Sequence, residues 1–204
     1  MNLNIFITFS PFCLMDNSKL ALLLGMMCGD GCLTIRTRKE GYKTYAVEFH
    51  NTELDKINLF QNLFSGLFGI QGNYHPEKGK DKRKIAYAFR SYSKEIFSQI
   101  ASLGFPIGLK KYKLRIPDIV WNFNRNEKML FIKGVIITDG SIRKQGNVLF
   151  HMGSKDFLDD LSNLIYELFE LRKGVKEYIQ KEKYFSYQLL LDKKQSQEIL
   201  NSKM

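Results

Sequence analysis

Two similar stretches constrain this chain more than any other feature. "LLLGMMCGDGCL" occupies residues 22–33, and "FIKGVIITDGSI" occupies residues 131–142. Each is largely apolar until it reaches an acid followed by glycine, Asp30-Gly31 and Asp139-Gly140. The match continues beyond the motifs. A Phe-His pair follows each motif, at residues 49–50 and 150–151, and precedes the next predicted helix. The repetition predicts a tandem duplication and a molecule with pseudo-two-fold symmetry.

The hydrophobic pattern predicts the same order of elements in both halves. In the first half we expect a helix that starts near residues 16–18, a hairpin over 31–51, a helix at about 53–68, a second hairpin with a charged turn, and a helix at about 93–103. In the second half we expect a helix over 127–140, two short strands around Gln145-Gly146-Asn147, a helix at about 154–172, strands at about 175–181 and 184–191, and a brief terminal helix.

The composition of the chain indicates the class of binding partner and the cellular compartment. The chain has 204 residues with 31 Lys+Arg against 21 Asp+Glu, a net charge of +10. This excess favours a polyanionic partner such as nucleic acid. Three cysteines without a disulfide pattern indicate a reducing, intracellular setting. Cys28 and Cys32 have no second Cys/His pair at zinc spacing, which favours packing thiols over half a metal site. Residues 1–15 are too short to span a membrane, and we expect an N-terminal extension there.

The two motif helices carry small residues at a four-residue spacing, which places them on one helix face. These residues are Gly25 and Gly29 in the first motif and Gly134 and Thr138 in the second. Small residues let two helix backbones approach closely, so we predict that the two helices pack together through this face. The packing would bring the two acids side by side.

Two adjacent carboxylates repel each other, and a divalent cation such as Mg²⁺ removes the conflict. A metal held between Asp30 and Asp139 under a phosphate-attracting surface suits phosphodiester hydrolysis. The alternative is that each Asp-Gly pair only ends a helix, with glycine in the cap. The presence of two copies, each after a pair of small residues, favours the metal.

The motifs resemble those of the LAGLIDADG homing endonucleases, in the single-chain form with two motifs. The matching nine-residue segments are "LLGMMCGDG" (23–31) and "IKGVIITDG" (132–140), with the acid in the eighth place. "GLKKYKLRIPDI" (108–119) resembles the segment that often precedes the second motif. Departures from the consensus, Met26 to Cys28 and Val135 to Ile137, are apolar and leave the acids and small residues in place.

The resemblance implies an α+β fold of two pseudo-symmetric αββαββα halves, each with a four-stranded antiparallel DNA-binding sheet, joined through the packed motif helices. We expect an extension at 1–15, a first half at 16–104, a linker at 105–125 and a second half at 126–204. The resemblance also implies a monomeric endonuclease that uses Mg²⁺, with Mn²⁺ or Ca²⁺ as possible occupants. It would cut both strands of a long asymmetric double-stranded DNA site across the minor groove and leave 3′ overhangs. Candidate metal ligands are Asp30, Asp139, Gly29 and Thr138.

The strands offer polar side chains opposite their apolar faces, where they can contact phosphates and base edges. An ordinary solvated sheet face is the alternative, but basic outward positions on four strands favour groove binding. The candidate DNA contacts are Thr34, Arg36, Arg38, Glu48, His50, Lys84, Arg90, Ser141, Arg143, Asn147 and His151.

Accessory catalytic groups come from the basic residues. His50 and His151 precede the middle helices and are either catalytic groups that orient water or donate to a phosphate, or plain DNA contacts. Lys110 matches a lysine position in related proteins and would stabilise developing negative charge. Lys111 and Lys113 are alternatives as phosphate contacts. The second half has no linker lysine that corresponds to Lys110, and Lys193 or Lys194 could take its place.

A second function from another class remains open. Some proteins of this type are RNA maturases or regulators that bind nucleic acid without cutting, usually after losing a motif acid. Both acids remain in this chain, which favours cleavage of DNA. Host intron RNA is therefore a second candidate partner, and no membrane partner is expected.

Overall fold

The computed structural model describes residues 15–78, 85–180 and 184–204. The expected extension at 1–15, apart from Met15, and the turn with Lys84 lie outside these ranges. The first half contains α1 (Asn17–Asp30), β1 (Gly31–Thr37), β2 (Lys43–Asn51), α2 (Leu54–Phe68), β3 (Asn73–Lys78), β4 (Ile85–Ser91) and α3 (Lys94–Ser102). This is the order that the hydrophobic pattern predicts. The Asp16 carboxylate caps α1 by accepting hydrogen bonds from the backbone N–H groups of Ser18 and Lys19.

The second half repeats the order after a short helix, α4 (Asp118–Trp121), that the sequence reading did not predict. It contains α5 (Arg125–Asp139), β5 (Gly140–Ile142), β6 (Val148–Met152), α6 (Lys155–Phe169), β7 (Lys176–Gln180), β8 (Tyr184–Leu191) and α7 (Lys193–Leu200). Asn124 and Glu127 form a capping box at the start of α5. The predicted helix at 154–172 ends earlier, at Phe169, because Glu170 adopts a left-handed conformation (φ 56°) and closes the helix.

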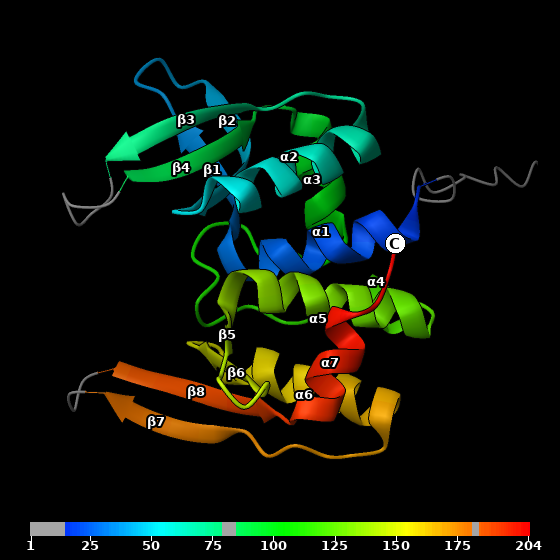
Figure 1. Cartoon of the computed structure of the whole chain (residues 1–204). Coiled ribbons are helices and arrows are strands. Elements are labelled where there is room, and N and C mark those ends of the chain that lie inside the picture. The colour runs from blue at the N-terminus through cyan, green and yellow to red at the C-terminus, as the bar shows by residue number, and fades with distance from the viewer. Residues whose placement is uncertain (1–14, 79–84, 181–183) are drawn as a thin grey trace, which may run out of the picture.

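Each half builds one antiparallel four-stranded sheet, with strand orders β1-β2-β4-β3 and β5-β6-β8-β7. Figure 1 shows helices α1 and α5 running side by side through the middle of the molecule, with one sheet on either side of them. Helices α2 and α3 pack on the first sheet, and α6 packs on the second. The α+β fold of two αββαββα halves is therefore confirmed, while the boundaries at residues 104 and 125 stay predictions.

Among the elements of the described ranges, α1 and α5 make the most extensive contact. A Cβ atom built on Gly25 would lie 2.0 Å from the Phe131 carbonyl oxygen, and one on Gly134 would lie 2.4 Å from the Leu22 oxygen. A Cβ atom on Gly29 would lie 2.0 Å from Thr138 Oγ1. No side chain fits at these distances, so the helices approach to backbone contact through the four small residues that the sequence places on one face.

The two first hairpins end in the same turn but differ in length. Arg38 and Arg143 each start a turn that closes at a glycine with positive φ, Gly41 (84°) and Gly146 (88°). Strand β1 has seven residues, whereas β5 has three. The first hairpin therefore extends farther from the motif helices than the second. None of the helices in the described ranges has the length and apolarity needed to cross a bilayer.

Candidate active site and nucleic-acid interface

Asp30 is the last residue of α1, and its carboxylate is partly buried. The side-chain amide of Asn51, at the end of β2, donates a hydrogen bond of 2.6 Å to Asp30 Oδ2. Burial raises the pKa of Asp30, although the Asn51 hydrogen bond and the charges of Lys110 and Lys56 oppose the shift. The acid of the first motif therefore has a fixed donor and three cationic groups, Lys110, Lys56 and His50, in its surroundings.

Asp139 is the last residue of α5 and lies close enough to Asp30 for the two charges to interact. Burial and the negative charge of Asp30, opposed by the charges of Lys110 and Lys56, together raise the pKa of Asp139 to about 6. A Cβ atom on Gly29 would lie 3.3 Å from Asp139 Oδ2, so the carboxylate sits against the other motif helix. The packing of small residues thus brings the two acids to one place, as the sequence predicts.

Lys110 lies at the same point, although it is far from both acids in sequence. Its ammonium group donates to the carbonyl oxygens of Met27 (3.0 Å), Cys28 (2.9 Å) and Gly29 at the end of α1. A cation at a helix C-terminus interacts favourably with the helix dipole. Burial lowers the pKa of Lys110, while the negative charge of Asp139 and of Asp30 opposes that shift.

The linker reaches this position by docking on the first sheet. Ile107 forms a bridge with Leu33 of β1, and the Gly108 N–H donates to the Leu33 oxygen at 2.8 Å. Farther along, Arg115 forms hydrogen bonds of 2.6 and 2.7 Å with Asp160 on α6. The linker is therefore attached to both halves, and Lys110 lies between the two attachment points.

Two cavities open at the acids, and each draws residues from both motifs. One, of about 340 Å³, is lined by Asp30, His50, Asn51, Lys56 and Thr138 among others. The other, of about 480 Å³, is lined by Asp139, Lys110, Lys111, His151 and Gly29 among others. Each cavity thus combines one motif acid, the residue that precedes the other acid, and the histidine of its acid's own half.

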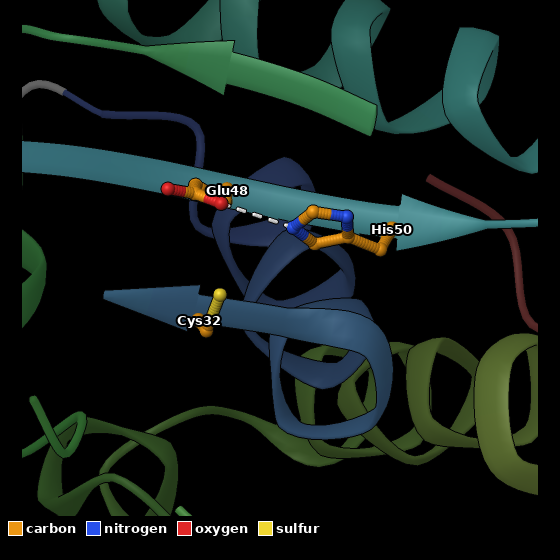
Figure 2. Close-up of side chains that lie close together, drawn as sticks. All are labelled: Cys32, Glu48 and His50. Carbon is orange, nitrogen blue, oxygen red and sulfur yellow. Dashed lines mark hydrogen bonds and ion pairs between the residues drawn. The ribbon is translucent and has the colours of Figure 1, made fainter. Parts of the chain in front are cut away.

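The outward face of the first sheet carries a cluster centred on Glu48. Its side chain lies on β2 between Cys32 on β1 and Arg90 on β4. Figure 2 shows Glu48 and His50 on the same strand, with Cys32 on the neighbouring one. Glu48 is only 1% exposed, because neighbouring side chains cover it. Its carboxylate is thus directed to other residues of the protein, although the strand alternation places it on the outward face.

Four neighbours satisfy the Glu48 carboxylate. Oε1 accepts hydrogen bonds of 2.7 Å from Thr34 Oγ1 and Arg36 Nη2, and Oε2 lies 3.1 Å from His50 Nε2 and 3.6 Å from Arg90 Nε. Burial would raise the pKa of Glu48, but the hydrogen bonds from His50 and Thr34 and the arginine charges lower it to about 2. Interactions with Cys32 and Glu48 raise the pKa of His50 to about 9.

Cys32, Glu48 and His50 also offer ligand atoms within 4.8 Å of one another, and these residue types can bind zinc. The carboxylate already has two guanidinium groups beside it, however, which disfavours a further cation there. Cys28 is fully buried, and burial raises its pKa to about 12, so this thiol stays neutral. The packing interpretation of Cys28 therefore agrees with its surroundings.

The other sequence candidates occupy varied places. Arg38, Ser141 and Arg143 are exposed, and Asn147 is partly buried beside the β5–β6 turn. His151 is exposed, and its Nε2 lies 2.6 Å from Ser186 Oγ. Lys193 lies against Gly146 of that turn, and neither it nor Lys194 lines the cavity with Asp139. Lys111 lies against Gly153 in that cavity, and Lys113 is exposed.

Sequence reasoning missed Asn51 and Lys56. Asn51 follows His50 directly, and Lys56 follows in the first turn of α2, so both were within the segment singled out. Their side chains face Asp30 because β2 ends beside α1, and this arrangement is visible only in the tertiary structure.

The second half of the chain matches a known family by sequence, and the whole chain matches solved structures by fold. Residues 126–203 match the family described as the LAGLIDADG-like domain. No curated protein matches the sequence. Among solved structures, the homing endonuclease I-DmoI in complex with DNA and Mn matches with a TM-score of 0.69 at 20% identity, over 92% of this chain and 99% of that chain.

Two other solved structures match similar shares of the chain. The homing endonuclease I-WcaI bound to its DNA recognition sequence has a TM-score of 0.60 at 17% identity, over 91% of this chain and 80% of that one. The N-terminal LAGLIDADG domain of DUF199/WhiA has a TM-score of 0.59 at 13% identity, over 92% and 83%. Residues 126–203 thus match a LAGLIDADG-like domain, and the chain as a whole has the LAGLIDADG homing endonuclease fold.

Proposed function

We propose that this protein is a monomeric, site-specific DNA endonuclease that depends on a divalent metal ion and hydrolyses both strands across the minor groove to leave 3′ overhangs. The observation that carries the proposal is the meeting of Asp30 and Asp139, one from each half, at the end of the α1–α5 contact. The relatives with this fold include I-DmoI in complex with DNA and Mn and I-WcaI bound to its recognition sequence.

The donor set fits a divalent cation. Burial disfavours the charged forms of both acids, and the negative charge of Asp30 adds to this effect at Asp139; a bound cation would reverse that preference. Asp30 and Asp139 would hold Mg²⁺, which when bound makes water more acidic and neutralises charge on phosphate oxygens. Structures of I-DmoI with Mn, with Ca and in the presence of Mg support the choice of ion.

The other two ligand candidates are less suited. The Gly29 oxygen already accepts a hydrogen bond from Lys110, so a cation there would meet an ammonium group. The Thr138 hydroxyl lies 3.1 Å from the Gly134 oxygen, to which it donates within its own helix. Both residues have a clearer role in the close packing of α1 and α5.

The remaining residues of the two cavities can act on the phosphates. The Lys110 ammonium group, partly buried beside both acids, would stabilise negative charge that develops on a phosphate oxygen. His50, with its pKa near 9, is protonated at neutral pH and can donate a hydrogen bond to a phosphate. His151 lies in the cavity of Asp139 and can contact the other strand.

Cleavage of a randomised double-stranded DNA library with Mg²⁺ tests the proposal. We expect one long site to be enriched among products with short 3′ overhangs. Asp30→Asn and Asp139→Asn should each reduce cleavage by about a thousand-fold or more while the protein still binds DNA. Asp159→Asn is the matched control, because Asp159 pairs with Lys155 on the surface of α6. Full cleavage by either motif variant would refute the metal-ligand assignment.

Binding without cleavage would favour the second function. If the unmutated protein retained folded intron RNA in preference to every DNA site and cut none of them, the maturase or regulator interpretation would replace the endonuclease.

A further inference from the structure

We propose that the two sheets select chemically different half-sites: the first sheet reads guanine through an arginine that Glu48 holds in place, and the second reads thymine methyl groups through Leu149 and Leu190. The proposal rests on the proposed function, because it concerns the DNA site that the two sheets contact.

Strand register identifies the positions that correspond between the sheets. In the first sheet, Gly31 pairs with Phe49 and Cys32 pairs with Glu48, which in turn pairs with Arg90. In the second sheet, Gly140 pairs with Phe150, and Ser141 pairs with Leu149, which in turn pairs with Leu190. Glu48 therefore corresponds to Leu149, and Arg90 corresponds to Leu190.

The row in the first sheet is charged and held by hydrogen bonds. Glu48 binds Arg36 and lies 3.6 Å from Arg90. The Arg36 side chain is 56% exposed, whereas that of Arg90 is 15% exposed. Arg36 is thus the guanidinium that can reach a DNA groove, and Glu48 is the positioning residue that fixes one of its nitrogens.

A guanidinium fixed in this way suits one base. Guanine presents two acceptors, N7 and O6, to the major groove, and arginine is its commonest partner. A side chain held in advance loses less conformational freedom when it binds, which favours this contact over a mobile arginine at the same position. The buried carboxylate itself is not available to accept from cytosine, because its four neighbours already use it.

The corresponding row in the second sheet is apolar. Leu190 is 41% exposed, and Leu149 beside it is partly exposed on the outward face. An exposed leucine pair at the position of an ion-pair cluster offers no hydrogen bond to a base edge. Apolar side chains in the major groove contact the thymine methyl group, which no other DNA base carries.

The test is selection of bound sites from a randomised duplex library in the presence of Ca²⁺, followed by sequencing. We expect guanine at one or two positions in one half-site and thymine at positions in the other. Arg36→Lys keeps the charge but removes the planar fork, so the preference for guanine should fall about ten-fold or more while thymine stays enriched. Leu149→Ala should have the reverse effect, so each variant is the control for the other.

Glu48→Gln separates positioning from direct contact. It should weaken the guanine preference at the same positions as Arg36→Lys, although Arg36 is intact. If guanine enrichment were unchanged in Arg36→Lys and in Glu48→Gln, or fell equally in both half-sites, the proposal would be overturned while site-specific binding still stood. If the unmutated protein enriched no site, the proposed function itself would fail, and the half-site assignment with it.

Discussion

Asn51 donates a hydrogen bond of 2.6 Å to Asp30, the acid of the first motif. Among the residues that the structure describes, no side chain donates in this way to Asp139. The register explains the difference, because the residue that corresponds to Asn51 in the second half is Met152. The two acids occupy equivalent positions in the repeat, yet Asp139 has the less favourable surroundings for a negative charge.

The raised pKa of Asp139 predicts that this acid destabilises the metal-free protein at neutral pH. Its folded-state pKa of about 6 lies above the ordinary aspartate value of 3.8, so its contribution to stability is lost as the pH rises from about 4 through about 6. Relative to the unmutated protein, Asp139→Asn should gain about 2 to 3 kcal/mol of unfolding free energy between pH 4 and pH 7. Urea unfolding at both pH values, without divalent metal, measures the difference.

The same variant should respond differently to Mg²⁺. The ion should raise the melting temperature of the unmutated protein, because it binds only the folded state, and raise that of Asp139→Asn much less. Asp159→Asn should behave as the unmutated protein does. Equal stabilisation of all three proteins by Mg²⁺ would place the ion elsewhere.

Replacing Lys110 by methionine should affect both stability and the pH profile of cleavage. Loss of the cation at the end of α1 should cost about 1 to 2 kcal/mol of unfolding free energy. Since Lys110 lowers the pKa of Asp139, its removal should also move the acidic limb of the single-turnover cleavage profile to higher pH. Lys113 is an exposed lysine of the same linker, so Lys113→Met should leave the acidic limb unchanged. An unchanged acidic limb in Lys110→Met would contradict the electrostatic role of Lys110.

The close approach of α1 and α5 predicts a severe effect of one methyl group. A Cβ atom at Gly25 would lie 2.0 Å from the Phe131 oxygen, so Gly25→Ala should destabilise the protein by about 3 kcal/mol. Gly66→Ala on α2 is the control, because its nearest neighbour would be Lys19 Cδ at 3.9 Å. That variant should be neutral or about 1 kcal/mol more stable, since alanine favours a helix. Denaturant midpoints of the two variants compare them directly, and similar values would rule out backbone contact at Gly25.

The charge of His50 should depend on Glu48. Its pKa of about 9 arises from interactions with Cys32 and Glu48, so Glu48→Gln should lower the pKa. Titration of the imidazole proton signals by NMR measures the change. Glu40→Gln removes an exposed carboxylate from the turn of the same hairpin and should not move the signal of His50. A His50 titration that is the same in both variants would show that Glu48 does not hold the charge.

The hydrophobic periodicity of the sequence and its internal repeat determine the order of the elements and the contact between the motif helices. The alternation along residues 31–51 predicts β1 and β2, and the spacing of Gly25, Gly29, Gly134 and Thr138 predicts the contact between α1 and α5. The reason is physical: a strand buries every second residue, and only small side chains allow two backbones to touch. The repeat itself also predicts that Asp30 and Asp139 occupy equivalent positions.

Tertiary structure decided which side chains accompany those acids. Asn51, Lys56 and Lys110 reach the site because β2 ends beside α1 and the linker docks on Leu33, and no local pattern encodes such distant contacts. Glu48 is the clearest example. Its strand position predicts an outward, exposed carboxylate, but Thr34, Arg36, His50 and Arg90 come from three strands and cover it. Sequence assigns a residue to a face of a sheet, whereas its partners depend on how neighbouring strands are paired.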